Sequence, residues 1–514
     1  MKTLRAFLYD NVVQVVLLKN MKILLVLLFA AASASANTYY IDYASGSDSN
    51  SGTSTNTPWK CCPGMSGFAG SYTHSAGDRF IFKGGVTWPS STLKITFSHG
   101  GAAANPDYYG VNTNYFAGSS WMRPILDGGA GTEVAFWLVN YNNIIIDNLE
   151  FNNWGMSGGV INAYTSTNIS ILNCCFHNWS HSGTTDDLKC INGSSYQAYS
   201  ANNVISNCVF DGSPLGTNSG MAVYHWSGVI KKCVAKNMSN GFLPNSGEVS
   251  GCQIGPINVS FDSNQHENAI ESLGNGSQYY FNNVIHNTVG VTIFIGNPGG
   301  PGYVYNNLIY NSTPVPIQFD GRSGGFNCYV YNNTVVSGTA LHNTGGGCYL
   351  YATNNHIIGS LVDSSFASVS QGNNLIQTVS QAAATGYSAA NNWQPTSTSS
   401  PTVDAGADLS VLFNTDINGN IRPQGTAWDI GAYEYPQAVP IINAVFHSGT
   451  NLIVSGTNGS PNGYYLVLAS TNLLLPRTDW TRLSTNSFNG SGNCIFTNPI
   501  TPNKPALFYL LQLQ

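Results

Sequence analysis

Charged side chains are scarce in this chain, so the few that gather in one short stretch are candidates for chemistry. Only 8% of the residues are charged. The densest ionisable group runs from His266 to Glu271 and includes Glu267. A carboxylate beside an imidazole raises its proton affinity and fixes its orientation, so His266 and Glu271 could transfer a proton as an acid–base pair. A histidine that only makes surface hydrogen bonds is the competing interpretation.

Several carboxylic acids in the same region suggest a second possible reaction, the hydrolysis of a glycosidic bond. That reaction uses two carboxyl groups, about 5–5.5 Å apart when configuration is retained and about 6.5–9.5 Å apart when it is inverted. Glu271 and Asp320 are one candidate pair, and the adjacent Asp186 and Asp187 are another. Each of these acids could equally be a solvated residue in a turn.

A polysaccharide lyase would need different groups from the same region. It requires a base that removes the proton next to a uronate carboxylate, and a cation that neutralises this carboxylate. Lys189, His266 and Arg322 have the required chemistry. Ca²⁺ would be the cofactor of a calcium-assisted lyase; otherwise the sequence implies no cofactor and no metal site. The small number of basic residues favours a hydrolase over a lyase.

Aromatic and polar side chains close to these residues in the sequence are candidates for substrate binding. Aromatic rings offer large apolar faces, and Tyr and Trp add a polar group at the edge. The same rings could instead be packed inside the protein, so both interpretations are kept. The candidates are Tyr224, His225, Trp226, Glu267, Phe294 and Arg322.

A repeated phrase must supply the elements that position these residues. From about residue 145 to residue 358 the chain repeats apolar–x–Asn–(Cys/Asn)–x–apolar every 19 to 34 residues. A strand-like phrase with that period indicates a solenoid whose coils stack on one another. The sequence therefore predicts an all-β chain built around a parallel β-helix.

The second member of the phrase predicts a column of like side chains inside the solenoid, because equivalent residues of stacked coils lie roughly 4.8 Å apart. Buried amides can satisfy one another in such a column, and cysteines fill it as small apolar groups. Free thiols are favoured over disulfides, since parallel side chains at this spacing fall outside disulfide geometry. The column is Cys174, Cys208, Cys233, Cys252, Asn283, Asn307, Asn333 and Asn355.

A second short strand follows the phrase in each coil, and its outward residues should form one continuous face. These strands are expected at residues 160–164, 187–192, 221–226, 241–245, 268–273, 291–295, 316–320 and 339–343. With Cys190, Ile270 and Ile317 inward, alternation places the polar residues outward. We therefore expect Asp187, Lys189, Glu271, Gln318 and Asp320 on this face.

The chain divides into four parts by composition. Residues 1–36 read as an export signal, with basic Lys19 and Lys22, an apolar run, and a cleavage site that ends at Ala36. Either Met1 or Met21 fits as the start. Residues 37–120 should form an N-terminal cap with the first irregular coils, and residues 121–435 the β-helix. Residues 440–514 alternate short apolar runs with turns, which predicts a small antiparallel β-sandwich.

The composition also limits the partners of this chain. Nucleic-acid binding calls for a basic patch, whereas the chain has 18 Lys and Arg against 24 Asp and Glu. The apolar run of the export signal is too short to span a membrane, so the mature chain should have no transmembrane segment. We expect a secreted monomer, and neutral or weakly charged polymers fit this composition better as partners.

The region 38–435 resembles the right-handed parallel β-helix superfamily that includes pectate lyases and several glycoside hydrolases. A more specific resemblance lies near its end, where Asp416 to Pro423 and Trp428 to Tyr435 are similar to the "choice-of-anchor Q" signature of exported bacterial β-helices. The resemblance implies an exported bacterial protein that handles glycans. It does not fix a reaction.

Two hypotheses of function follow from these observations. The first is an exported enzyme that cleaves glycosidic bonds of a polysaccharide, with a hydrolase favoured over a lyase. The second is a surface adhesin or glycan-binding β-helix without catalysis. The acids and His266 should converge in one groove under the first hypothesis and be dispersed under the second.

Overall fold

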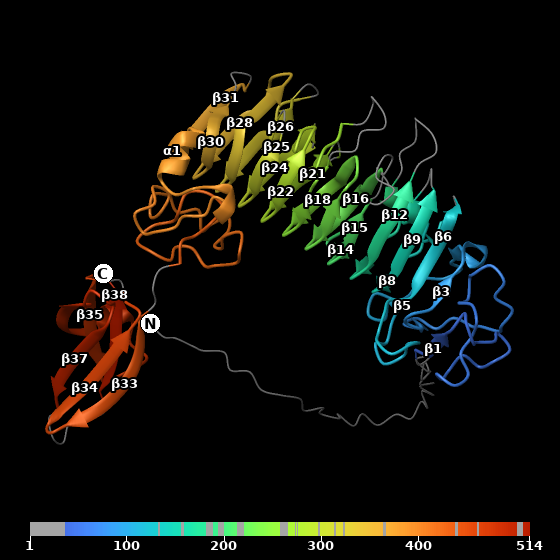
Figure 1. Cartoon of the computed structure of the whole chain (residues 1–514), viewed down its shortest axis with the longest axis horizontal. Coiled ribbons are helices and arrows are strands. Elements are labelled where there is room, and N and C mark those ends of the chain that lie inside the picture. The colour runs from blue at the N-terminus through green and yellow to red at the C-terminus, as the bar shows by residue number, and fades with distance from the viewer. Residues whose placement is uncertain are drawn as a thin grey trace, which may run out of the picture. The chain divides into compact units, whose positions relative to one another are not determined.

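The fold is nearly all β. This computed structural model describes residues 36–131, 134–155, 159–180, 189–193, 200–212, 220–257, 266–272, 274, 276–296, 299–312, 315–321, 324–362, 366–436, 440–459, 462–500 and 507–513. Within these residues, 32 strands are connected by hydrogen-bonded pairings, and every pairing joins parallel strands of successive coils. Figure 1 shows these strands stacked one after another from β1 to β31. The predicted parallel β-helix is confirmed.

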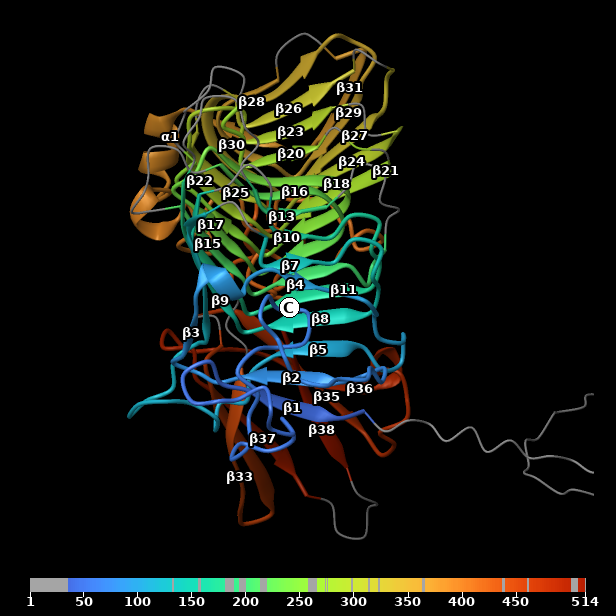
Figure 2. The ribbon, with the colours of Figure 1, turned by 90° about the vertical axis from the view of Figure 1, so that its right-hand side faces the viewer.

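Each coil contributes strands to three sheets, here named sheets I, II and III, and Figure 2 shows the labels of sheet III one above another from β4 to β26. Sheet I contains β1 (Thr38–Ile41), β2 (Arg79–Phe82), β5 (Asp107–Gly110), β8 (Ile144–Asp147), β11 (Ile169–Leu172), β14 (Val204–Ser206), the end of β16 (Met221–Lys231), the end of β18 (Asn240–Ser250), β21 (Gly276–Phe281), β24 (Gly299–Tyr305), β27 (Asn327–Tyr331), β29 (Tyr349–Thr353) and β31 (Ser368–Gly372).

Sheet II follows sheet I in each coil. It contains β3 (Thr87–Trp88), β6 (Ile125–Gly131), β9 (Glu150–Gly155), β12 (Cys175–Ser180), β15 (Val209–Asp211), β17 (Val234–Lys236), β19 (Gln253–Ile254), β22 (Val284–Thr288), β25 (Leu308–Ser312), the start of β28 (Thr334–Thr344), β30 (His356–Val362) and β32 (Leu375–Gln377). Sheet III contains β4 (Ile95–Thr96), β7 (Phe136–Trp137), β10 (Gly159–Asn162), β13 (Lys189–Asn192), the starts of β16 and β18, β20 (Ile270–Ser272), β23 (Ile293–Gly296), β26 (Ile317–Asp320) and the end of β28.

The repeated phrase forms the corner between sheets I and II, and its first member turns the chain. That residue has a left-handed backbone in every coil, with φ between +49° and +60°. Asn tolerates this conformation better than most residues because its short polar side chain can bond locally. The residues are Asn148, Asn173, Asn207, Lys232, Gly251, Asn282, Asn306, Asn332, Asn354 and Asn373.

The second member of the phrase points inward, as the sequence predicts. Cys174 and Cys208 donate through Sγ to carbonyl oxygens of Ile146 and Ile171 in the preceding coil, and Asn307 donates through Nδ2 to the corresponding oxygen of Tyr280 at 2.8 Å. Cys and Asn therefore satisfy the same backbone group. The amides of the column also hydrogen-bond to one another, because Asn307 Nδ2 donates to Asn333 Oδ1 at 2.9 Å. All eleven cysteines are free thiols, which confirms that prediction.

Inward columns of apolar side chains fill the space between the three sheets. On sheet I, Ile146, Ile171 and Ile205 stack in register and are fully buried. On sheet II, the rings of Phe151 and Phe176 stack with centroids 4.7 Å apart, and Phe210 continues the stack at 4.8 Å. Every coil therefore buries apolar surface against its neighbours, which is the main source of stability in a solenoid.

A closing segment packs against the last coils. It begins with α1 (Val379–Ala384), capped by Thr378, and the short 3-10 helix η2 (Ala389–Asn391). Residues 404–435 then run along the left-handed corner. There the side-chain amides of Asn306, Asn332, Asn354 and Asn373 donate to carbonyl oxygens of the closing segment at 2.7–2.9 Å. The acceptors are, in the same order, Thr415, Asp429, Ala407 and Ala405.

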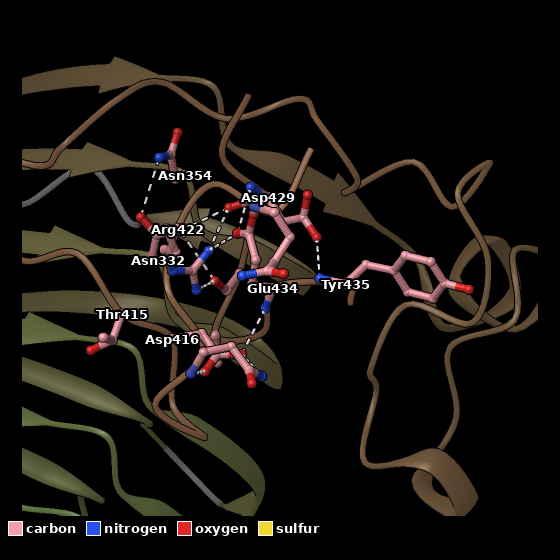
Figure 3. Close-up of polar contacts among 12 residues, drawn as sticks. Asn332, Asn354, Thr415, Asp416, Arg422, Asp429, Glu434 and Tyr435 are labelled. Carbon is pink, nitrogen blue, oxygen red and sulfur yellow. Dashed lines mark hydrogen bonds and ion pairs between the residues drawn. The ribbon is translucent and has the colours of Figure 1, made fainter. Parts of the chain in front are cut away.

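A buried ion pair holds this closing segment together (Figure 3). Arg422 Nη1 donates to Glu434 Oε2 at 2.9 Å, and both side chains are fully shielded from solvent. Arg422 Nη2 also reaches Asn306 Oδ1 at 3.3 Å, which ties the pair to the coils. Burial raises the pKa of Asp429, which lies beside the pair, to about 7. The closing segment thus covers corner amides that would otherwise face solvent.

The last strands form two small antiparallel sheets, as expected. One contains β33 (Ile441–Ser448), β34 (Asn451–Thr457) and β37 (Cys494–Pro499), and the other contains β35 (Tyr464–Ser470), β36 (Thr481–Ser487) and β38 (Phe508–Leu513). The 3-10 helix η3 (Arg477–Asp479) precedes β36, and η1 (Ser90–Thr92) lies in the N-terminal cap. Within the described ranges, no helix is long and apolar enough to cross a membrane.

Candidate functional site

The outer face of sheet III carries one column of side chains along the coils. Strand pairing places Asn192 and Tyr224 in this column, and Glu271, Phe294 and Gln318 follow in later coils. The pairing of Phe242 with Ile270 joins the two parts of the column. Ile270 and Ile317 point inward, so Glu271 and Gln318 face outward, as alternation predicts.

His266 and Glu271 meet at the edge of this face. His266 Nδ1 lies 3.3 Å from Glu271 Oε1, and Asn268 Nδ2 donates to Glu271 Oε2 at 3.0 Å. The Glu271 side chain is 6% exposed, whereas the His266 side chain is 63% exposed. The hydrogen bond that Glu271 accepts from His266 raises the pKa of His266, although partial burial of the ring opposes this effect. A buried carboxylate therefore orients an accessible imidazole.

Lys189, Tyr224 and His225 form a second group on sheet III. Lys189 is 8% exposed, and its Nζ lies 4.0 Å from the centre of the Tyr224 ring. The rings of Tyr224 and His225 stack with centroids 3.8 Å apart. A cation over an aromatic face is attracted by about 0.5–2 kcal/mol. The group therefore presents a positive charge and two packed rings on the coils that precede Glu271.

Two candidates in this region have an unusual backbone. His225 and Glu267 have φ values of +51° and +47°, a left-handed conformation that costs a side chain other than Gly about 1–3 kcal/mol. Each lies against a glycine of the next or preceding coil. A Cβ on Gly193 would lie 2.4 Å from the carbonyl oxygen of His225, and one on Gly290 would lie 1.9 Å from that of His266. These two glycines let neighbouring coils approach the site closely.

The structure corrects the expected register of β13. Ile191, rather than Cys190, aligns with the inward residues Ile161 and Val223. Lys189 is therefore three residues away from Asn192, the residue that shares a column with Glu271. The cause is the pair of adjacent apolar residues, Cys190 and Ile191, which are both fully buried and make the alternation ambiguous.

Asp320 lies on the outward side but not directly above Glu271. It follows Gln318, the residue in the Glu271 column, by two positions. Two coils and two residues correspond to a Cα separation of about 12 Å. The Asp320 side chain is also buried, with 7% exposure. Both acids therefore lie on the outward side, but the column that contains Glu271 passes through Gln318 and not through Asp320.

The remaining candidates differ in accessibility. Trp226 is fully buried and donates through Nε1 to Asn203 O at 3.3 Å, so its ring has no exposed face for a sugar. Phe294 pairs in register with Glu271 and is 7% exposed. Asp186, Asp187 and Arg322 lie outside the described residues. Their roles, like those of the other candidates, stay predictions.

Sequence reasoning missed several residues that shape this site. Asn268 binds Glu271, and Gly290 admits the backbone of His266. The side-chain oxygens (Oδ1) of Asn162, Asn192 and Asn268 are buried and accept no hydrogen bond from the described residues. Such acceptors are normally satisfied, so these three could bind hydroxyl groups of a ligand or water. Asn-rich strands gave no signal of this, because Asn is common throughout the chain.

A calcium ion would need oxygen ligands from this part of the chain. Ca²⁺ takes six to eight oxygen ligands, often from several carboxylates. Across the described part of the chain, no group of three or more His, Cys, Asp or Glu side chains could hold a metal ion. Both Glu271 oxygens already accept hydrogen bonds. The described residues therefore do not fit a calcium site.

The comparisons with known proteins concern the fold. No protein-family model matches this chain, and no curated protein matches it. A GH136 lacto-N-biosidase from Eubacterium ramulus has a TM-score of 0.46 and 11% identity, covering 67% of this chain and 68% of that one. The pectate lyase Pel9A has a TM-score of 0.43 and 16% identity, with 78% and 97% covered. The tailspike protein of E. coli bacteriophage HK620, in complex with a pentasaccharide, has a TM-score of 0.33 and 12% identity, with 85% and 87% covered.

Proposed function

We propose that this chain is an exported carbohydrate-active enzyme that cleaves glycosidic bonds of a polysaccharide bound along the outer face of sheet III. The observation that carries the proposal is the contact between His266 and Glu271. It joins an accessible imidazole to a buried carboxylate, which is the arrangement that a general acid or base requires. The raised pKa of His266 favours the protonated form of its imidazole.

Hydrolysis is the first form of the proposal. His266 and Glu271 would move a proton to or from the glycosidic oxygen or the attacking water, and a second carboxyl group would complete the site. Asp186, Asp187 and Asp320 are the candidates for that second group. The low content of basic residues supports a neutral or weakly charged polysaccharide as the substrate.

Elimination is the second form of the proposal. In this reaction His266 removes the proton next to a uronate carboxylate, the electron pair forms a carbon–carbon double bond, and the glycosidic oxygen leaves. Lys189, or Arg322, would offset the carboxylate charge. The Lys189 ammonium lies over the Tyr224 ring, two coils before Glu271 on the same sheet.

A digest of a polysaccharide panel by the mature chain tests the proposal. New reducing ends without ultraviolet absorbance would support hydrolysis, and new reducing ends with the absorbance of an unsaturated sugar would support elimination. Retention of a glycan on an affinity gel without any product would favour an adhesin instead. In that case Glu271→Ala should leave the retention unchanged.

Export and modular organisation belong to the same proposal. Residues 1–36 would be removed, so mass spectrometry of secreted protein should give a chain that begins at Asn37. Residues 440–514 would fold as a separate module. Limited proteolysis should then cut between Pro436 and Pro440 and leave two folded fragments, whereas cuts spread over the β-helix would contradict this organisation.

A further inference from the structure

A cavity lies in the N-terminal cap, far from Glu271. Its volume is about 260 Å³. Thr96, at the end of β4, lines it and pairs with Trp137, and six coils separate Thr96 from Glu271 along sheet III. At roughly 4.8 Å per coil this is about 29 Å. The aromatic and imidazole side chains that line the cavity are Phe68, Tyr72, His74, Phe97, His99 and Tyr109.

Two buried carboxylates fix the polar groups of this cavity. His74 Nε2 lies 2.8 Å from Asp107 Oδ2, and the Tyr72 hydroxyl donates to Asp78 Oδ2 at 2.9 Å. Asp78 and Asp107 are 0% and 1% exposed, so they lie behind the side chains that line the cavity and hold them in place. If the proton of a neutral His74 is on Nε2, Nδ1 is an acceptor, and the Tyr72 oxygen can also accept. The cavity therefore offers acceptors at fixed positions.

Aromatic rings form the rest of the wall. Phe97 and Tyr109 pack edge to face with centroids 5.2 Å apart, and both are largely buried. His99 is exposed and stacks on His74, with centroids 4.9 Å apart. The ligand that matches this wall has apolar C–H faces and several hydroxyl donors around one ring. A sugar ring has that surface.

The volume of the cavity and the charges around it limit the choice of ligand further. Drug-sized ligands occupy about 300–1,000 Å³, so this cavity suits something smaller. Two buried carboxylates lie behind this wall, and no Lys or Arg is among the described residues that line the cavity, which disfavours an anionic ligand. A carboxylate also only accepts hydrogen bonds, so it cannot replace the hydroxyl donors that Tyr72 and His74 need. We propose that this cavity binds a single neutral pyranose residue, as a glycan-binding site separate from the face that carries Glu271.

Saturation-transfer NMR and calorimetry on the mature chain can test this site. The probes are methyl glucoside, methyl galactoside and methyl mannoside, with glucuronate as the anionic comparison. At least one neutral glycoside should bind, and glucuronate should bind at least tenfold more weakly. Ser98→Trp, at an exposed position that lines the cavity, should fill it and lower the affinity at least tenfold.

His99→Ala provides a second variant, because it removes a wall of the cavity without leaving Asp107 unpaired. It should also lower the affinity, while Glu271→Gln should leave it unchanged. Wild-type melting temperatures would show that the variants fold. The proposal is overturned if no neutral glycoside binds, if glucuronate binds equally well, or if both cavity variants bind as the wild type does. None of these results depends on cleavage at Glu271.

Discussion

Glu271 holds His266 from a position that solvent hardly reaches. Because the carboxylate stabilises the charged imidazole, Glu271→Gln should lower the pKa of His266 toward its ordinary value of 6.5. NMR titration of the His266 ring protons measures this change. Glu267→Gln is the matched control, since Glu267 contributes less to the same shift. An unchanged His266 pKa in Glu271→Gln would show that the two side chains do not interact in solution.

The candidate site was only partly predictable at the scale of single residues. The outward direction of Glu271 follows from alternation with Ile270, and its contact with His266 follows from their short separation in sequence. The burial of Trp226 could not be predicted from the sequence, because an aromatic residue can pack either inside or outside the coil. The lateral displacement of Asp320 depends on coil lengths that vary from 19 to 34 residues.

The inward corner column can be tested element by element. Asn333 donates to Val304 O and accepts from Asn307 N, so Asn333→Ala leaves buried backbone groups without partners. Each such group costs about 1–3 kcal/mol, and the variant should lose roughly 3 kcal/mol of unfolding free energy. Cys252→Asn should change stability by less than about 1 kcal/mol, because Asn extends the column by one coil. Denaturant unfolding measures both, and equal losses would contradict the shared role of Cys and Asn.

The closing segment depends on one buried cation. Arg422→Met leaves Glu434 buried without its partner, which should cost about 3–5 kcal/mol of unfolding free energy. Lys60→Met, a change at an exposed cation, should cost less than about 0.5 kcal/mol. Denaturant unfolding of the two variants compares them directly. Similar small losses would show that the segment does not need the ion pair to remain docked.

Stability of the whole molecule should respond to pH through two buried groups with opposite signs. Asp429 has its pKa raised to about 7, so its contribution is complete below the ordinary value of 3.8 and is lost as pH rises through 7. His356 has its pKa lowered to about 4 by burial, so its contribution is present above 6.5 and is lost as pH falls through 4.

Replacing one of these two groups isolates the pH-dependent stability that the other contributes. Between pH 4 and 7, Asp429→Asn should make stability rise more steeply with pH than in the wild type, and His356→Gln should make it fall more steeply. Thermal melts across this range measure the two slopes. Parallel curves for the wild type and both variants would contradict these assignments.

The architecture of the whole molecule was far more predictable than its site. The phrase with Asn and Cys marks the corner of each coil from β8 onward, because a left-handed turn and an inward small side chain recur there. The docking of residues 404–435 on that corner was not foreseen. It joins Asn306 to Arg422 across more than a hundred residues, and no local pattern records such a contact.

His266 and Glu271 are the proposed catalysts of polysaccharide cleavage on sheet III. The direct measurement is the initial cleavage rate of His266→Ala on a panel substrate, beside His286→Ala, a histidine on the outer face of sheet II. Loss of a general acid or base should lower the rate by about 10²–10⁴-fold in His266→Ala, while His286→Ala keeps the wild-type rate. Equal rates for the two variants would contradict the account.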